Sequence, residues 1–332
     1  MHMSTVTVKI ETNIHLQSIL VATDFSPASE KALRHALSIA RHYDAKLYVM
    51  HVVSSVGLNM AGPDAVAAAT TLALRDAMLA ERRLVASGVL RDLRHHVIVR
   101  SGDVWTELEA EIKQQAIDLV VIGTHGRTGL KRLVLGSVSE HVFRNACCRV
   151  LTVGPCSPVD AHLEPDGAPR SLLFTTDFGD ASLKALPYAT SLANQRQTRL
   201  ALLHILSSLP KIDGNRWYTA SDVVEMRSAA ESEARKHLQQ LVANVPLAVE
   251  PQFFVSFGEP AEEILHAASE LHSEVIVMGL RCREHVGTIS HLPWSTAYGV
   301  VCNAVCPVLT VRENPQDWRW AWERPRSTVQ VD

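Results

Sequence analysis

A duplication inside the chain constrains its fold more strongly than any other feature. Residues 20–33 match residues 173–186 at most positions when the two stretches are compared at an offset of 153. Near the end of each copy, residues 150–153 and 308–311 both read Val-Leu-Thr-Val. A period of about 155 residues is far longer than that of a solenoid repeat, so each copy is predicted to be a domain with its own core.

Both copies alternate apolar runs with segments of helical periodicity. In the first copy, Ser26 and Pro27 precede an apolar stripe at helical spacing, which predicts a capped helix. Strands are expected there at 18–23, 46–53, 96–100, 119–122 and 150–153, with further helices at 64–87, 102–116 and 137–145. In the second copy, strands are expected at 171–176, 199–205, 252–256, 275–278 and 308–311, and helices at 181–194, 221–242, 260–271 and 295–302. This alternation predicts an α/β fold with a parallel sheet covered on both faces.

The length of 332 residues also favours two domains over one. We expect a first domain at 1–157, a linker at 158–169, a second domain at 170–313 and a tail at 314–332. The linker region is rich in proline, which is typical of a connection between domains. The tail contains three alternating tryptophans, which either pack on their own domain or form a partner-binding segment.

Composition argues against several classes of partner. The net charge of −3 gives no electrostatic reason to expect a nucleic-acid or membrane surface. The first residues lack the apolar core of a signal peptide, and no later run reaches membrane-spanning length, so we expect a cytoplasmic protein.

The six cysteines form no Cys-x-x-Cys pair and are expected to be reduced thiols. Cys282, His285, His291, Cys302 and Cys306 match no regular zinc spacing, so no metal site is assigned.

The stretch with the clearest chemistry follows the apolar run 119–122. It contains Gly123, Gly126 and Gly129 and then Gly136-Ser137, and it is interpreted as strand, phosphate loop and helix. Residues without Cβ allow a ligand to approach the backbone or allow positive φ. Ser137 is predicted to cap the helix, with Glu140 completing a capping box. The alternative is a glycine-rich turn that only connects a strand to a helix.

A helix N-terminus at this position would bind an anion. Its free N–H groups and its dipole favour negative charge, and Arg127, Lys131 and Arg132 add positive charge. The spacing of Gly123, two residues, Gly126, nine residues and Gly136-Ser137 resembles the nucleotide-binding signature of the ATP-binding branch of the universal stress protein family. It is neither a Walker A sequence nor a Rossmann fingerprint.

The resemblance covers both copies and implies two doubly wound five-stranded parallel-sheet domains with strand order 3-2-1-4-5. The ligand would lie beyond the carboxyl ends of strands 1 and 4. It is expected to be ATP, or AMP or ADP, with Mg²⁺. The residues that the resemblance assigns to it are Ala22, Thr23, Asp24, Val52, Val53, Ile122, Gly123, His125, Gly126, Arg127, Gly129, Lys131, Arg132, Gly136, Ser137 and Val138. Asp24 has an alternative role in a turn, and His51 is interpreted as structural because His204 recurs in the second copy.

The second copy departs from this pattern. Cys282 replaces the second glycine, and Pro293 and Trp294 stand near the position of Gly136, so no nucleotide is expected there. We therefore expect a stress-response regulatory protein that binds an adenine nucleotide in its first half, with no catalytic residue assigned. One alternative is a slow ATPase or a nucleotidyl-transferring enzyme, for which His125 is the only candidate base in the loop. A second alternative is a nucleotide-free interaction scaffold with an unknown protein partner.

The last strand of each copy leaves an edge that invites a partner. We expect strands 150–153 and 308–311 to pair antiparallel within the molecule, because a linker of about 15 residues spans roughly 50 Å. The monomer would then be a pseudo-dimer, with a homodimer through other surfaces left open. Four cysteines are expected to be buried reduced thiols near this joint, namely Cys147, Cys148, Cys302 and Cys306.

Overall fold

The computed structural model of the chain describes residues 14, 16–54, 63–124, 135–155, 157, 170–206, 219–280 and 292–312. The predicted linker 158–169 and tail 314–332 lie outside the described residues. The strands form one ten-stranded sheet in the order β3-β2-β1-β4-β5-β10-β9-β6-β7-β8. Each half therefore has the strand order 3-2-1-4-5, which confirms the predicted fold class.

Helices and strands alternate along both halves, close to their predicted positions. The first half contains β1 (Ser18–Ala22), α1 (Pro27–Tyr43), β2 (Lys46–Val53), α2 (Pro63–Ala86), β3 (His95–Ser101), α3 (Val104–Gln114), β4 (Leu119–Gly123), α4 (Ser137–Asn145) and β5 (Arg149–Val153). The second half contains β6 (Ser171–Thr175), α5 (Asp180–Arg196), β7 (Arg199–Leu206), α6 (Ala220–Val242), β8 (Gln252–Phe257), α7 (Pro260–Glu270), β9 (Ser273–Leu280), α8 (Leu292–Asn303) and β10 (Val308–Arg312).

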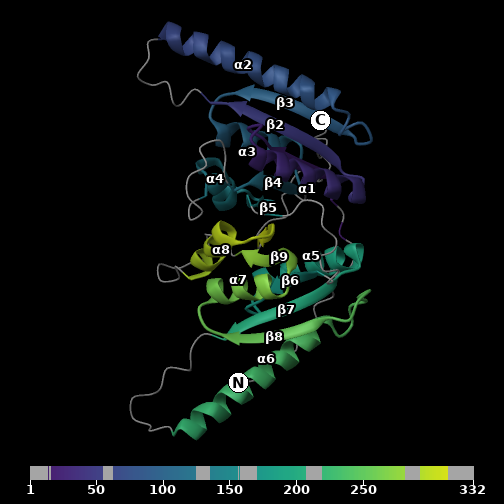
Figure 1. Ribbon diagram of the computed structural model, residues 1–332, viewed down its shortest axis with the longest axis vertical. Coiled ribbons are helices and arrows are strands. Elements are labelled where there is room, and N and C mark those ends of the chain that lie inside the picture. Colours follow the sequence, from purple (N-terminus) through teal and green to yellow (C-terminus); the bar gives the residue numbers. More distant parts are fainter. Residues whose placement is uncertain are drawn as a thin grey trace, which may run out of the picture.

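Helices cover both faces of the sheet (Figure 1). On one face, buried residues of α1, α5 and α6 join one cluster with strand residues of both halves, such as Leu151 and Leu309. On the other face, α3 and α4 pack on the first half, and α7 and α8 pack on the second. Strands buried on both faces are nearly uniformly apolar, which explains why β4 reads Leu-Val-Val-Ile-Gly.

The two halves meet through their last strands. β10 pairs with β5 in the antiparallel direction, with Leu309 opposite Leu151, whereas all other neighbours in the sheet are parallel. The hydroxyl of Thr152 donates to the carbonyl oxygen of Val308, and that of Thr310 donates to Val150, each at 3.2 Å. The predicted intramolecular pseudo-dimer is thus confirmed.

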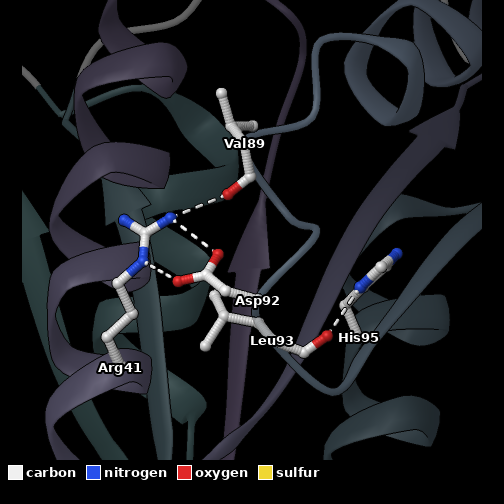
Figure 2. A network of polar contacts seen from close by, with 5 residues as sticks. All are labelled: Arg41, Val89, Asp92, Leu93 and His95. Carbon is white, nitrogen blue, oxygen red and sulfur yellow. Dashed lines mark hydrogen bonds and ion pairs between the residues drawn. The ribbon is translucent and has the colours of Figure 1, made fainter.

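A surface network fixes the far end of the first half (Figure 2). Arg41, in the last turn of α1, makes two hydrogen bonds to the carboxylate of Asp92, at 2.7 and 3.1 Å, and donates to the carbonyl oxygen of Val89 at 2.9 Å. Nδ1 of His95 lies 2.9 Å from the carbonyl oxygen of Leu93 in the same turn. The contacts of Arg41 hold the connection between α2 and β3 against α1, near the β3 end of the sheet (Figure 1).

The predicted capping box of α4 is wrong. Gly136, not Ser137, is the N-cap residue, and no side chain caps the helix. The helix covers Ser137–Asn145 as predicted, and the backbone N–H of its N-cap Gly136 donates to the carbonyl oxygen of Thr124 at 2.9 Å. Glu140 instead pairs with Arg144, one turn along the helix, at 2.8 Å.

The prediction of buried thiols at the joint is wrong for one residue. Cys148, Cys302 and Cys306 are buried and reduced, but Cys147 is exposed because it lies in the turn before β5. The start of α8 also differs from its prediction, since the helix begins at Leu292 rather than at residue 295. Within the described ranges, no helix is both long enough and apolar enough to cross a membrane.

Candidate functional site

A cavity of about 220 Å³ lies at the carboxyl ends of β1, β2 and β4. It opens at the point where the strand order reverses, with β1 and β4 side by side. Ligands of doubly wound folds bind at such a point, because the loops on either side run in opposite directions. The lining residues are Ala22, Thr23, Asp24, Ser29, Met50, His51, Val52, Val104, Leu108, Ile122, Gly123, Gly136, Ser137, Val138 and Ser139.

One wall of the cavity is apolar. Met50 and Val52 come from β2, Ile122 ends β4, and Val104 and Leu108 are one turn apart on α3. Met50, Leu108 and Ile122 are at most 4% exposed and belong to the core cluster of this face. This wall suits a flat apolar group such as an aromatic base.

The start of α4 contributes a polar part of the lining, with Gly136, Ser137 and Ser139. Because Gly136 provides no side-chain cap, the N–H groups of the first turn depend on other partners. The hydroxyl of Ser139 donates to the carbonyl oxygen of Gly123 at 2.6 Å, which ties this turn to the end of β4. Such a helix end attracts an anion through its N–H donors and its dipole.

Asp24 stands in the turn between β1 and α1 and also lines the cavity. Its Oδ1 accepts a hydrogen bond from the backbone N–H of Ser26 at 3.0 Å. In the second half, Oδ1 of Asp177 accepts from Gly179 at 2.9 Å. The turn role of Asp24 is therefore present in both halves, and any contact with a ligand would be an additional role.

His51 has a structural role that is repeated in the second half. Its Nδ1 lies 2.7 Å from the carbonyl oxygen of Thr23, and Nδ1 of His204 lies 2.8 Å from that of Thr176. Because a carbonyl oxygen only accepts, Nδ1 carries the proton in both residues. Each imidazole also packs on the phenylalanine that follows the shared Asp, with ring centroids 4.9 and 4.4 Å apart. The structural interpretation of His51 is thus confirmed.

Gly123 is explained by helix packing. A Cβ on this residue would lie 3.2 Å from the backbone carbon and oxygen of Ala28 in α1. The equivalent Cβ on Gly279 would lie only 2.3 Å from the backbone of Ala181 in α5. Glycine at this position allows the helix to approach the strand in both halves. Its presence in the second half therefore says nothing about a ligand there.

The structure brings together nine of the predicted site residues, namely Ala22, Thr23, Asp24, Val52, Ile122, Gly123, Gly136, Ser137 and Val138. Val53 is not among the residues that line the cavity. The carbonyl oxygen of Val53 accepts from Gly102 at 3.1 Å. Six predicted residues lie outside the described ranges, namely His125, Gly126, Arg127, Gly129, Lys131 and Arg132.

Sequence reasoning missed six lining residues, namely Ser29, Met50, His51, Val104, Leu108 and Ser139. Two of them follow from periodicity. Met50 shares a strand face with Val52, and Leu108 lies one helical turn after Val104. The involvement of α3 could not be read from the glycine pattern, because that pattern contains only the β4–α4 connection.

In the second half, Pro293 and Trp294 fall in the first turn of α8, and Cys282 lies outside the described residues. The same holds for His285 and His291, which the sequence considered as metal ligands. Among the residues that the structure does describe, no three His, Cys, Asp or Glu side chains gather as a metal site.

Comparisons with known proteins match both halves. The model of the universal stress protein family matches residues 15–154 and 169–312. Universal stress protein MJ0531 of Methanocaldococcus jannaschii is 33% identical over 140 residues, which are 41% of this chain and 81% of that protein. A protein of unknown function from Pseudomonas aeruginosa, PA1789, has a similar crystal structure, with a TM-score of 0.60 and 16% identity, covering 90% of this chain and 93% of its own. A universal stress protein from Archaeoglobus fulgidus gives a TM-score of 0.58 at 19% identity and covers 89% and 98%.

Proposed function

Because the chain belongs to the universal stress protein family, we propose that it is a regulatory protein of the stress response whose N-terminal half binds an adenine nucleotide. The observation that supports this proposal is the cavity between β1 and β4, which combines an apolar wall with the uncapped start of α4. A nucleotide has the same two characters, an apolar base at one end and an anionic phosphate chain at the other.

Each part of the nucleotide has a matching part of the cavity. The base would lie against Val52, Val104 and Ile122, and the carboxylate of Asp24 would accept a hydrogen bond from the ribose. The phosphates would lie at the first turn of α4. Gly126, Gly129 and the side chains of His125, Arg127, Lys131 and Arg132 belong to the proposed phosphate site.

ATP with Mg²⁺ is the proposed ligand, and AMP and ADP share its recognition chemistry. Mg²⁺ in nucleotide sites is bound by phosphates and by one or two carboxylates. Asp24 is the only carboxylate among the described lining residues. The fit is therefore sufficient for a metal held mainly by the nucleotide.

Binding without rapid turnover agrees best with these side chains. Phosphoryl transfer needs carboxylates that hold metal and a group that orients the nucleophile. Asp24 and His51 are the titratable side chains among the described lining residues, and both have structural contacts in the β1–α1 turn. We therefore propose a binding role, in which occupancy of the site is the signal.

The test compares two matched variants by calorimetric titration with Mg-ATP. Asp24→Ala removes both the turn contact and the proposed ribose contact, whereas Asp177→Ala removes the equivalent turn contact in the second half together with a hydrogen bond from the Ser182 hydroxyl. We expect one nucleotide per chain, with at least a tenfold loss of affinity in Asp24→Ala, equivalent to about 1.4 kcal/mol. Asp177→Ala is expected to bind as the unchanged chain does.

Two outcomes would contradict the proposal. If the unchanged chain does not bind Mg-ATP, AMP or ADP, the nucleotide proposal is wrong. If two nucleotides bind and both variants lose affinity, the second half also has a site, and the proposed asymmetry is wrong. Mass spectrometry of the ligand released from freshly purified, denatured protein would identify the resident nucleotide.

A further inference from the structure

The start of α4 is anchored in the C-terminal half of the molecule. Leu135, the residue before the N-cap Gly136, is only 3% exposed and belongs to a hydrophobic cluster made almost entirely of second-half residues. The other members of this cluster include Val300, Val301 and Cys302 of α8. α4 and α8 occupy corresponding positions in the two halves and lie next to each other across the joint (Figure 1).

Further contacts connect α4 to the second half. Phe143 is fully buried in the same cluster, and its ring centroid lies 6.3 Å from that of Tyr298. The guanidinium of Arg144 lies over the ring of Tyr298 at 5.9 Å. Arg312 of β10 donates to the carbonyl oxygen of Phe143. Both ends of α4 are therefore held by residues of the second half.

The backbone of Leu135 also takes part. Burial raises the pKa of the Tyr298 hydroxyl and that of the Cys302 thiol, and the nearby backbone of Leu135 lowers the pKa of both groups in part. Tyr298 and Cys302 lie one turn apart on α8. Both residues belong to or pack against the cluster that contains Leu135, one residue before the helix start that lines the cavity.

The same few residues are fixed from the N-terminal half as well. Gly136 donates to Thr124, Thr124 donates to Val153 of β5, and each of these hydrogen bonds is 2.9 Å long. Gly136 is thus fixed by a hydrogen bond to the residue after β4, and its neighbour Leu135 packs in the cluster that contains α8. A shift of Leu135 would move the N–H donors of the first turn of α4.

The residues that connect α4 to α8 differ between the two halves. At the offset that aligns β5 with β10, Leu135 corresponds to Pro293 and Tyr298 corresponds to Glu140. The second half therefore lacks the leucine of the first. The first half likewise lacks a tyrosine at the position of Tyr298.

We propose that the C-terminal half positions the nucleotide site of the N-terminal half, with Leu135 as the positioning residue that α8 holds in place. This inference rests on the proposed nucleotide binding. It means that the C-terminal half contributes to the affinity of the N-terminal half for the nucleotide. Because binding couplings are reciprocal, a bound nucleotide will also stabilise the packing of α4 on α8.

The experiment uses the full chain with four substitutions. Leu135→Ala removes the anchor, Leu135→Met conserves its volume, and Tyr298→Phe removes a hydroxyl whose pKa the nearby Leu135 backbone lowers. The control is Leu203→Ala, which takes an equal volume from the same cluster. Leu203 lies in β7, separated from β10 by β6 and β9. A general loss of core packing would affect the control as much as Leu135→Ala.

Calorimetric titration with Mg-ATP gives the first readout. We expect Leu135→Ala to bind at least tenfold more weakly, and Tyr298→Phe a few-fold more weakly. Leu135→Met and Leu203→Ala should remain within twofold of the unchanged chain. Equal affinities for Leu135→Ala and the unchanged chain would overturn the proposal, as would equal losses in Leu135→Ala and Leu203→Ala.

Amide hydrogen exchange without nucleotide gives a second readout, which separates this inference from the proposed function. Leu135→Ala should accelerate exchange in the first turns of α4 at least tenfold relative to Leu203→Ala. If exchange responds in this way but no variant binds Mg-ATP, the anchor exists and the proposed function is wrong. If exchange in α4 does not respond, the anchor is wrong whatever the nucleotide result.

Discussion

Cys148 and Cys306 occupy corresponding positions just before the two strands of the joint. Burial raises the pKa of each thiol to about 12, from an ordinary value of 9.0. In the unfolded chain both thiols lose their protons near their ordinary pKa, whereas in the folded chain they keep them. Above about pH 9 the folded state therefore binds more protons than the unfolded state, and stability falls as pH rises.

This sign gives a prediction for alkaline stability. Between about pH 9 and pH 12, each thiol should lower the free energy of unfolding by about 1.4 kcal/mol per pH unit. The double variant Cys148→Ala, Cys306→Ala should lose less stability over this range than the unchanged chain. Urea denaturation at a series of pH values measures the two slopes. Parallel slopes would show that these thiols do not keep their protons in the folded state.

Residues shared by the two halves mainly build the turn after the first strand. The backbone N–H of Phe25 donates to the hydroxyl of Thr23 at 3.0 Å, and Phe178 donates to Thr176 at 2.9 Å. Phe25 and Phe178 have φ values of 58° and 59°, which are costly for residues other than glycine. The shared Thr, Asp, Phe and His side chains surround this strained turn. Identity between the copies thus indicates structure here, and the difference between their glycine loops remains the argument for a site in one half.

At the scale of elements, α1 packs on β4 and α5 packs on β9, each at a glycine of the strand. The two contacts differ in closeness, so the two glycines are predicted to differ in their tolerance of a side chain. Gly279→Ala should be severely destabilising, because its Cβ would overlap the backbone of Ala181 at 2.3 Å. Gly123→Ala should cost less, about 1–3 kcal/mol, because Ala28 is 3.2 Å away and α1 can shift slightly. Urea denaturation of the two variants gives the comparison.

The order of the two effects is the critical result. If Gly123→Ala were the more destabilising variant, the close approach of α5 to β9 would be wrong. Gly299→Ala is a suitable control, since its Cβ would meet only the side chain of Ala261, at 3.2 Å. We expect this substitution in α8 to change the free energy of unfolding least of the three.

Most elements could be predicted from the sequence because they carry strong local signals. Ser26 caps α1 as expected, and its hydroxyl accepts from the N–H of Ser29 at 3.3 Å. The capping box predicted for α4 failed for a tertiary reason, since the backbone hydrogen bond from Gly136 to Thr124 sets the helix start. Val53, which the resemblance named together with Val52, is absent from the cavity lining, and its part in the site stays a prediction.

The role of the second half could not be predicted, because it depends on contacts between residues more than 150 positions apart. Leu135 and Phe143 look like ordinary apolar residues of the first copy. Their place in the second-half cluster follows from the antiparallel pairing of β5 and β10. The pairing itself was predicted from the unpaired edges, but the side chains that it brings together were not.

At the scale of the whole molecule, the continuous sheet makes the two halves one structural unit. The cluster on the α1 and α5 face contains buried residues from both halves, among them Val153 and Val311 at the joint. A second cluster joins Leu135 and Phe143 to α8. A partly unfolded molecule with one folded half would expose both of these apolar surfaces to water, which is unfavourable.

We therefore predict that the two halves unfold together. The slowest-exchanging amides of β2 and β7, one strand from each half and both far from the joint, should give equal opening free energies and equal dependence on urea. Leu309→Asp would place an unpaired charge, opposite Leu151, in a position that is 6% exposed in the unchanged chain, and should separate the two transitions. Hydrogen exchange measured by mass spectrometry reports both strands in one sample.

If β2 and β7 already open with different free energies in the unchanged chain, the halves are independent domains. The joint would then only tether them, and the anchoring of α4 by α8 would be too weak to control the nucleotide site.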